Sequence, residues 1–146
     1  MSTNTIKSVE QKRASQAYEY AKQGQKLGAS QKDGEDSNEA KEYKSYTKKL
    51  AMMIKTNGLG ATIAFVKAKS SKAAYRKLYE QLSGWLIEEC PVTHFLFENK
   101  DKELVEAVIH LPFHEYRTVT VETLALMAWV SRFAEGLIQG ESTENN

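Results

Sequence analysis

EYRTVTVETLALMAWVSRFAEGL, residues 115–137, is the stretch of this sequence that decides the fold class. Its apolar side chains recur about every three to four residues, which predicts a helix over roughly 115–138. The apolar surface of this helix is broad enough to indicate the central helix of a bundle. The residues expected on that surface are Val121, Leu124, Leu126, Ala128, Trp129, Val130, Phe133, Leu137 and Ile138.

The same spacing predicts further helices on the N-terminal side of this one. They are expected over 5–23, 39–56, 61–69, 72–88 and 102–110. Proline cannot continue a helix, so Pro91 and Pro112 should stop the last two. The residues expected to cap the helices that begin near 39, 72 and 102 are Asn38, Ser71, and Asp101 or Asn99.

No strand pattern and no internal repeat interrupts these segments. We therefore expect an all-α protein, a single compact bundle of about six helices. The predicted domain spans 1–146, with its core over about 5–139, a mobile loop at 24–38 and a disordered tail at 140–146. The chain has one cysteine, no pattern typical of a signal peptide and no apolar run of the roughly 20 residues that cross a bilayer. We expect a soluble cytoplasmic protein with no membrane contact.

A pair of glycines breaks the helical pattern at NGLG, residues 57–60. Asn57 and Gly58 can adopt the left-handed conformation that ends a helix, and Gly60 lets the chain turn closely. Two interpretations follow. The break is an ordinary corner between helices, or it exposes backbone N–H groups that welcome an anion beside Lys55.

The charges of the chain are unevenly distributed. Residues 41–77 carry ten basic side chains against one acidic, a net charge of +9, whereas residues 78–146 carry four basic against twelve acidic, a net charge of −8. On a helix over 39–56, Lys41, Lys44, Lys48 and Lys55 fall on one side, opposite Tyr43, Thr47, Leu50 and Ile54. This lysine ridge, expected to face outward, either attracts a polyanion or is a solvated face that partly neutralises the acidic half.

Residue types that perform catalysis form no convincing set. His110 and His114 have the spacing of a helical metal pair, but Pro112 lies between them. Cys90 is expected to be a small buried thiol. No phosphate-binding loop, nucleophile elbow or dinucleotide fingerprint is present. We expect no enzyme activity, no cofactor, no metal and no small-molecule substrate.

Three stretches together resemble a known family: VEQKRASQAYEYA (9–21), YKSYTKKLAMMIKTNGLGATIAFVKAK (43–69) and EYRTVTVETLALMAWVSRFAEGL (115–137). In this order and spacing they are similar to the small helical subunit of the Cmr complex, the type III-B CRISPR effector. The match is poorest at 24–40 and 88–112. The resemblance implies a compact, non-catalytic structural subunit in antiviral defence, several copies of which stack into a minor filament.

The resemblance also implies partners: the backbone RAMP protein that holds the crRNA, further copies of this chain, and single-stranded target RNA. Within the matching stretches it suggests Arg13, which lies in an apolar stripe and so is either paired or at an interface. The charge pattern and the resemblance together predict RNA contacts by Arg13, Lys41, Lys44, Lys48, Lys49, Lys55, Asn57, Lys67, Lys69, Arg117 and Arg132. One alternative is a protein–protein adaptor whose basic face docks an acidic partner without touching RNA. Another is an enzyme whose metal is held by His110, His114 and a carboxylate.

Overall fold

The computed structural model describes residues 2–28 and 36–141, and side chains from residue 9 onward within them. Its elements are α1 (Ser2–Gln25), α2 (Asn38–Asn57), α3 (Leu59–Ala68), α4 (Ala73–Ser83), a π-helical turn η1 (Gly84–Glu89), a 3-10 turn η2 (His94–Leu96), α5 (Leu104–Ile109) and α6 (Phe113–Leu137). No strand occurs within the described ranges. The predicted all-α fold class is confirmed. Residues 29–35 of the predicted mobile loop and 142–146 of the predicted tail lie outside the described residues.

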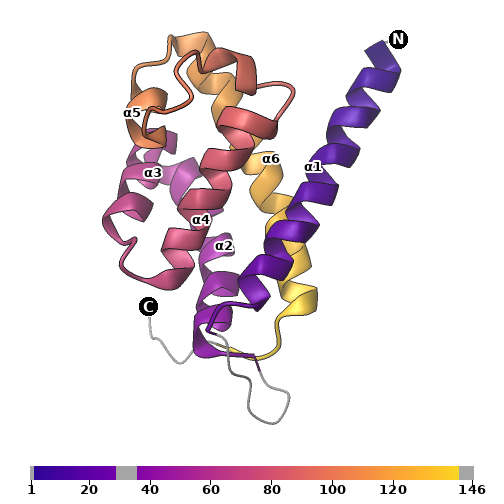
Figure 1. Cartoon of the computed structure of the whole chain (residues 1–146), viewed down its shortest axis with the longest axis vertical. Coiled ribbons are helices and arrows are strands. Elements are labelled where there is room, and N and C mark those ends of the chain that lie inside the picture. Colours follow the sequence, from indigo (N-terminus) through magenta and orange to yellow (C-terminus); the bar gives the residue numbers. More distant parts are fainter. Residues whose placement is uncertain (1, 29–35, 142–146) are drawn as a thin grey trace.

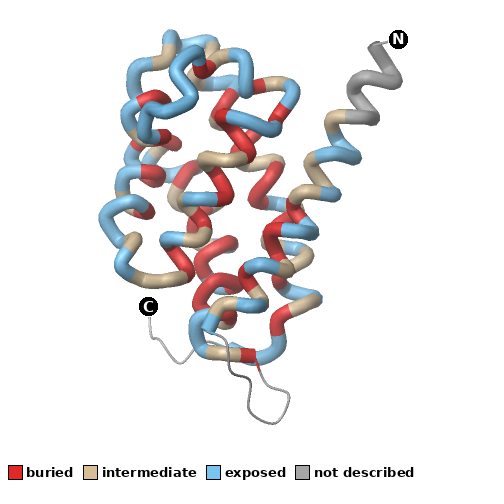
Figure 2. Tube along the Cα trace, in the orientation of Figure 1, coloured by how far each residue is buried: buried red, intermediate tan, exposed pale blue. Residues whose placement is uncertain are grey.

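Helices α2 and α6 together organise the bundle, because α2 packs against α1, α3, α4 and α6. Helix α6 makes its most extensive contacts with α1 and α2. Figure 1 shows α1 and α6 along one flank of the molecule and α3 and α5 on the other. Leu126, Met127 and Val130 of α6 are almost fully buried. In Figure 2 the buried positions gather in the interior of the bundle, and most exposed ones lie on its outside. The predicted apolar surface was wrong at Val121 and Ala128, which are exposed, because the buried stripe runs instead through Val119 and Thr123.

A buried polar network joins α1, α2 and α4 inside the core. The Tyr43 hydroxyl lies 2.6 Å from Gln81 Oε1, and Gln81 Nε2 donates to the Tyr20 carbonyl at 3.0 Å. Burial raises the pKa of Tyr43 well above its ordinary value, so the phenol stays protonated and able to donate. Gly24 lies against the Tyr43 ring, in space that no larger side chain could share. The network therefore fixes how closely α1 approaches α2.

The glycine break is a corner between α2 and α3. Gly58 has φ +92° and its N–H donates to the Ile54 carbonyl, which closes α2. The Gly60 N–H donates to the Tyr116 hydroxyl at 2.8 Å, so this donor is already used by α6. A Cβ on Gly60 would come within 3.3 Å of Ile109. These contacts favour the interpretation of the break as a structural corner.

Three predicted caps were wrong. Ser37, not Asn38, precedes α2, and its hydroxyl accepts the Ala40 N–H at 3.0 Å. Helix α4 follows Lys72 rather than Ser71, and α5 follows Glu103 rather than Asp101 or Asn99. Ser37 rather than Asn38 takes the cap position, and its hydroxyl also donates to the Leu27 carbonyl. This second hydrogen bond joins the start of α2 to the turn that follows α1.

Candidate nucleic-acid interface

The N-terminal half of the predicted lysine ridge does not face outward. Lys44 is buried, with 7% of the residue exposed, and its Nζ donates to the Ile138 carbonyl at 3.1 Å. Gly140 lies against the Lys41 side chain, since a Cβ there would be 2.9 Å from Lys41 Cε. The chain that leaves α6 therefore crosses this part of α2. The prediction that Lys44 is presented outward is wrong, and Lys41 is half-buried.

Two other predicted lysines are exposed but paired with carboxylates of the same chain. Lys48 Nζ lies 2.6 Å from Glu135 Oε1, and Lys67 Nζ lies 3.2 Å from Glu103 Oε1. Hydrogen bonding to Lys48 lowers the pKa of Glu135 below its ordinary value. Glu103 also accepts a hydrogen bond from Tyr79 at 2.7 Å, and its pKa is lowered first by Tyr79 and then by Lys67. These pairs link the basic segment to the acidic half.

A different set of side chains brings two basic groups to one aromatic ring. Lys49 of α2 and Lys69, which follows α3, each place their Nζ 5.8 Å from the centre of the Phe65 ring. Phe65 meets Tyr75 of α4 edge-on, at 5.5 Å and 87°. Tyr75 stacks on Tyr46 of α2 at 3.9 Å. We call Lys49, Phe65 and Lys69 the Phe65 surface; two packed aromatic rings from α2 and α4 support it.

The Phe65 surface retains its positive charge. Within residues 9–28 and 36–141, neither Lys49 nor Lys69 has a carboxylate within 4.0 Å, unlike Lys48 and Lys67. Lys72, nearby on the chain, donates to Glu42 and to the Tyr46 hydroxyl, both at 3.3 Å. Two uncompensated ammonium groups beside an aromatic ring can attract a phosphate and contact a planar group.

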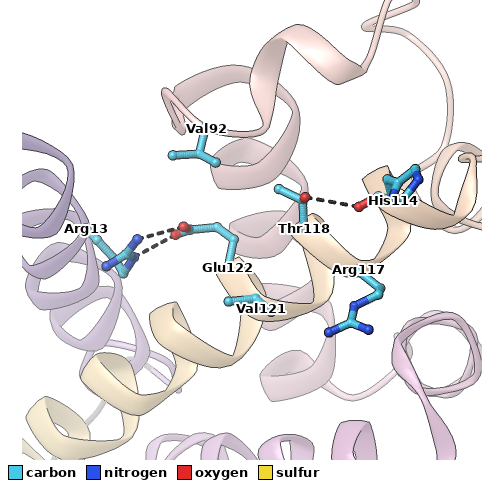
Figure 3. A pocket seen from close by; sticks show the side chains of 7 residues that line it. All are labelled: Arg13, Val92, His114, Arg117, Thr118, Val121 and Glu122. Carbon is cyan, nitrogen blue, oxygen red and sulfur yellow. Dashed lines mark hydrogen bonds and ion pairs between the residues drawn. The ribbon is translucent and has the colours of Figure 1, made fainter. Parts of the chain in front are cut away.

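The groove between α1 and α6 holds a second set of predicted residues (Figure 3). It has a volume of about 490 Å³ and is lined by Arg13, Val92, His114, Arg117, Thr118, Val121 and Glu122. Arg13 donates to both oxygens of Glu122, each at 2.7 Å, and the Trp85 indole donates to Glu122 at 2.9 Å. Donating these hydrogen bonds to Glu122 raises the pKa of Arg13. Of the two alternatives for Arg13, pairing is confirmed.

The remaining predicted residues are accessible at separate places. Lys55 and Asn57 are exposed at the end of α2, and Arg132 is exposed on α6. Arg117 is exposed, with its guanidinium 5.9 Å from the Phe113 ring, and in Figure 3 it points away from Arg13. The structure thus brings Lys49 and Lys69 together and leaves the arginines apart from them.

Two residues of these sites escaped the analysis of the sequence. Phe65 adjoins the apolar side of its helix, so its half-exposed position between two lysines depends on tertiary packing. Glu122 could have been found, because it lies one helical turn from the buried Leu126 and Val119, where only a paired carboxylate is tolerated. A charged residue inside the apolar stripe of each of two helices is a signal that they pair.

The residues with possible catalytic chemistry are dispersed. Among the parts of the chain that the structure describes, no group of three or more His, Cys, Asp or Glu could hold a metal ion. His110 Nδ1 lies 2.8 Å from the Glu106 carbonyl oxygen. Cys90 is fully buried, as predicted. No helix in the described ranges is long and apolar enough to span a membrane.

Comparisons with known proteins point to one family. The family model described as CRISPR-associated protein (Cas_Cmr5) matches residues 9–137. A Thermus thermophilus protein named "CRISPR system Cmr subunit Cmr5" is 30% identical over 98 residues, which span 67% of this chain and 76% of that protein. The crystal structure of a CRISPR-associated Cmr5 family protein from Thermus thermophilus superposes with a TM-score of 0.63 at 26% identity, covering 90% of this chain and 98% of the other. The chain therefore belongs to the Cmr5 family, the small all-α subunits of the type III-B CRISPR Cmr complex.

Proposed function

We propose that this protein is a non-catalytic structural subunit that forms the minor filament of the type III-B effector complex and contacts RNA there. The Phe65 surface is the observation that supports RNA contact, since Lys49 and Lys69 keep their charge in a chain whose other exposed lysines are partly paired internally. The partners are the backbone RAMP protein, further copies of this chain, the crRNA and single-stranded target RNA.

The division of labour in this proposal is physical. In an RNA-guided complex, base pairing with the guide reads the sequence, so a subunit beside the duplex needs only to hold the backbone. Lys49, Lys69 and the exposed Lys55 neutralise phosphates and release their counterions. The opposite charges of residues 41–77 and 78–146 favour contacts between the basic surface of one copy and the acidic surface of the next. Contacts of this head-to-tail kind can build an open filament.

The test is charge reversal in the reconstituted complex. Lys49→Glu with Lys69→Glu should weaken the binding of target RNA while the complex still assembles. A matched control, Lys12→Glu with Lys102→Glu, makes the same change in charge at two exposed lysines away from the Phe65 surface. Assembly is measured by size-exclusion chromatography, and RNA binding by filter retention. Equal RNA affinity for both double variants, in intact complexes, contradicts the proposed RNA contact.

The same experiment addresses the adaptor function, which the pairing of Lys48 with Glu135 and of Lys67 with Glu103 favours. In these ion pairs the basic segment contacts carboxylates of its own acidic half, the kind of contact that an acidic partner surface would also offer. If the basic face docks a protein, reversing Lys49 and Lys69 prevents the subunit from joining the complex. The particles that do form would then bind RNA with unchanged affinity.

A further inference from the structure

The aromatic ring at the centre of the Phe65 surface is placed differently from a core phenylalanine. Phe65 is half-exposed and has the ammonium groups of Lys49 and Lys69 near its ring, whereas Tyr75, which packs against it, is almost fully buried. Tyr75 is perpendicular to Phe65, at 87°, so it covers one edge or one face of that ring. The two ammonium nitrogens lie 5.8 Å from the ring centre. A group stacked on the ring would lie closer, at about 3.5–4.0 Å, so the two nitrogens are not at stacking distance.

The support beneath Phe65 is rigid. Tyr46 and Tyr75 come from different helices and stack nearly parallel, at 8°. Both are buried, so the rings of α2 and α4 fix the position of the ring from α3. A ring held by other rings needs no ordering when a planar ligand arrives, and this lowers the entropic cost of binding.

From this geometry we infer that Phe65 is a stacking platform for a single unpaired nucleobase, with Lys49 and Lys69 holding the phosphates on either side of that nucleotide. Proteins that track single strands combine aromatic rings with a basic groove, and every base offers a π-face, so the site selects for unpaired bases rather than for sequence. This inference rests on the proposed RNA contact and adds a base to what was a contact with the backbone alone.

The experiment separates bases from phosphates. The full-length chain is titrated at low salt with two oligomers of about 12 nucleotides, within the usual range of site sizes: oligouridylate and an abasic ribose-phosphate of the same length. Phe65→Leu should weaken binding of oligouridylate by roughly 5- to 150-fold, the range for losing one stacked base, and should leave the abasic oligomer unaffected. Phe65→Trp, which keeps an aromatic ring at this position, should bind oligouridylate about as well as the unchanged chain.

Changes at the two lysines should affect the two oligomers equally. Lys49→Gln with Lys69→Gln should weaken both oligomers by the same factor, because the phosphates are common to them. Circular dichroism at increasing temperature verifies that each variant is folded. A second measurement uses the complete complex: target RNA with 5-iodouridine at each position in turn should cross-link to Phe65 at an unpaired nucleotide.

Each outcome decides between the ideas. If Phe65→Leu weakens both oligomers equally or neither, while the lysine variant weakens both, the stacking site is overturned and the RNA contact stands. If neither set of changes alters binding, the stacking site and the proposed RNA contact are both overturned. If the chain binds neither oligomer and Phe65 yields no cross-link in the complex, the stacking site is overturned, and the charge reversal in the complex decides the RNA contact.

Discussion

At the scale of the residue, the pair formed by Arg13 and Glu122 is the contact most sensitive to change. Only 4% of the Glu122 side chain and 17% of the Arg13 side chain are exposed. Arg13→Met keeps the aliphatic stem but leaves a buried carboxylate without its cation, a change that typically costs roughly 3–5 kcal/mol. We expect a loss of that order in the free energy of unfolding, measured by urea denaturation.

Two further variants show whether charge is the cause. Arg13→Met combined with Glu122→Gln removes the unpaired charge and keeps an oxygen for the Trp85 indole, so it should be more stable than Arg13→Met alone. Lys12→Met, on the exposed side of α1, should change stability by less than about 0.5 kcal/mol. A double variant no more stable than Arg13→Met would show that packing, not charge, dominates.

Gly24 and Gly136 form a matched pair of helical glycines at the same scale. A Cβ on Gly24 would collide with three ring atoms of Tyr43, which is fully buried, whereas a Cβ on Gly136 meets nothing within 4 Å. Overpacking costs roughly 1–3 kcal/mol and exceeds the helical gain of about 0.5–1 kcal/mol. Gly24→Ala should therefore lower the thermal midpoint and Gly136→Ala should raise it or leave it unchanged. Equal shifts would contradict the close packing of α1 on α2.

At the scale of the element, the corner between α2 and α3 depends on the backbone rather than on space. Gly58 has φ +92° and ψ 162°, a region almost restricted to glycine, yet a Cβ there would meet only the Tyr116 hydroxyl, at 3.7 Å. Gly58→Ala should cost about 1–3 kcal/mol, read from chemical denaturation. Asn57→Ala, one residue earlier and exposed, is the control and should have little effect.

The elements show what the sequence could and could not predict. Apolar periodicity located each of the six α-helices in the described part of the chain, because burial of one face is a local pattern. The helix ends were less predictable: Ser37 rather than Asn38 caps α2, and its hydroxyl also donates to the carbonyl of Leu27, ten residues earlier. Likewise, the helix predicted over 72–88 is not one continuous α-helix, since Gly84–Glu89 form a π-helical turn after α4. The spacing of apolar residues does not reveal a π-helical turn, which holds about one residue more than an α-helical turn.

At the scale of the whole molecule, charge counting located the basic segment but not its accessible part. Residues 41–77 contain both Lys44, which the end of α6 covers, and Lys49, which remains half-exposed. Which lysine is available depends on contacts between residues about 90 positions apart, as the hydrogen bond from Lys44 to Ile138 shows. The structure shows that some of these lysines pair with the acidic half, and the attraction of a polyanion by the others stays a prediction.

This distribution leads to a prediction about the salt dependence of RNA binding. Each phosphate neutralised on a single strand contributes about −0.7 to the slope of log K against log salt concentration. If Lys49 and Lys69 each contact one phosphate, replacing both by glutamine should make the slope shallower by about 1.4. Lys44→Met should leave the slope unchanged and instead lower stability, because it removes a buried hydrogen bond to Ile138. Binding of oligouridylate is measured from low to moderate salt. A slope that responds to Lys44 and not to Lys49 and Lys69 would mean that the chain end covering α2 is displaced when RNA binds.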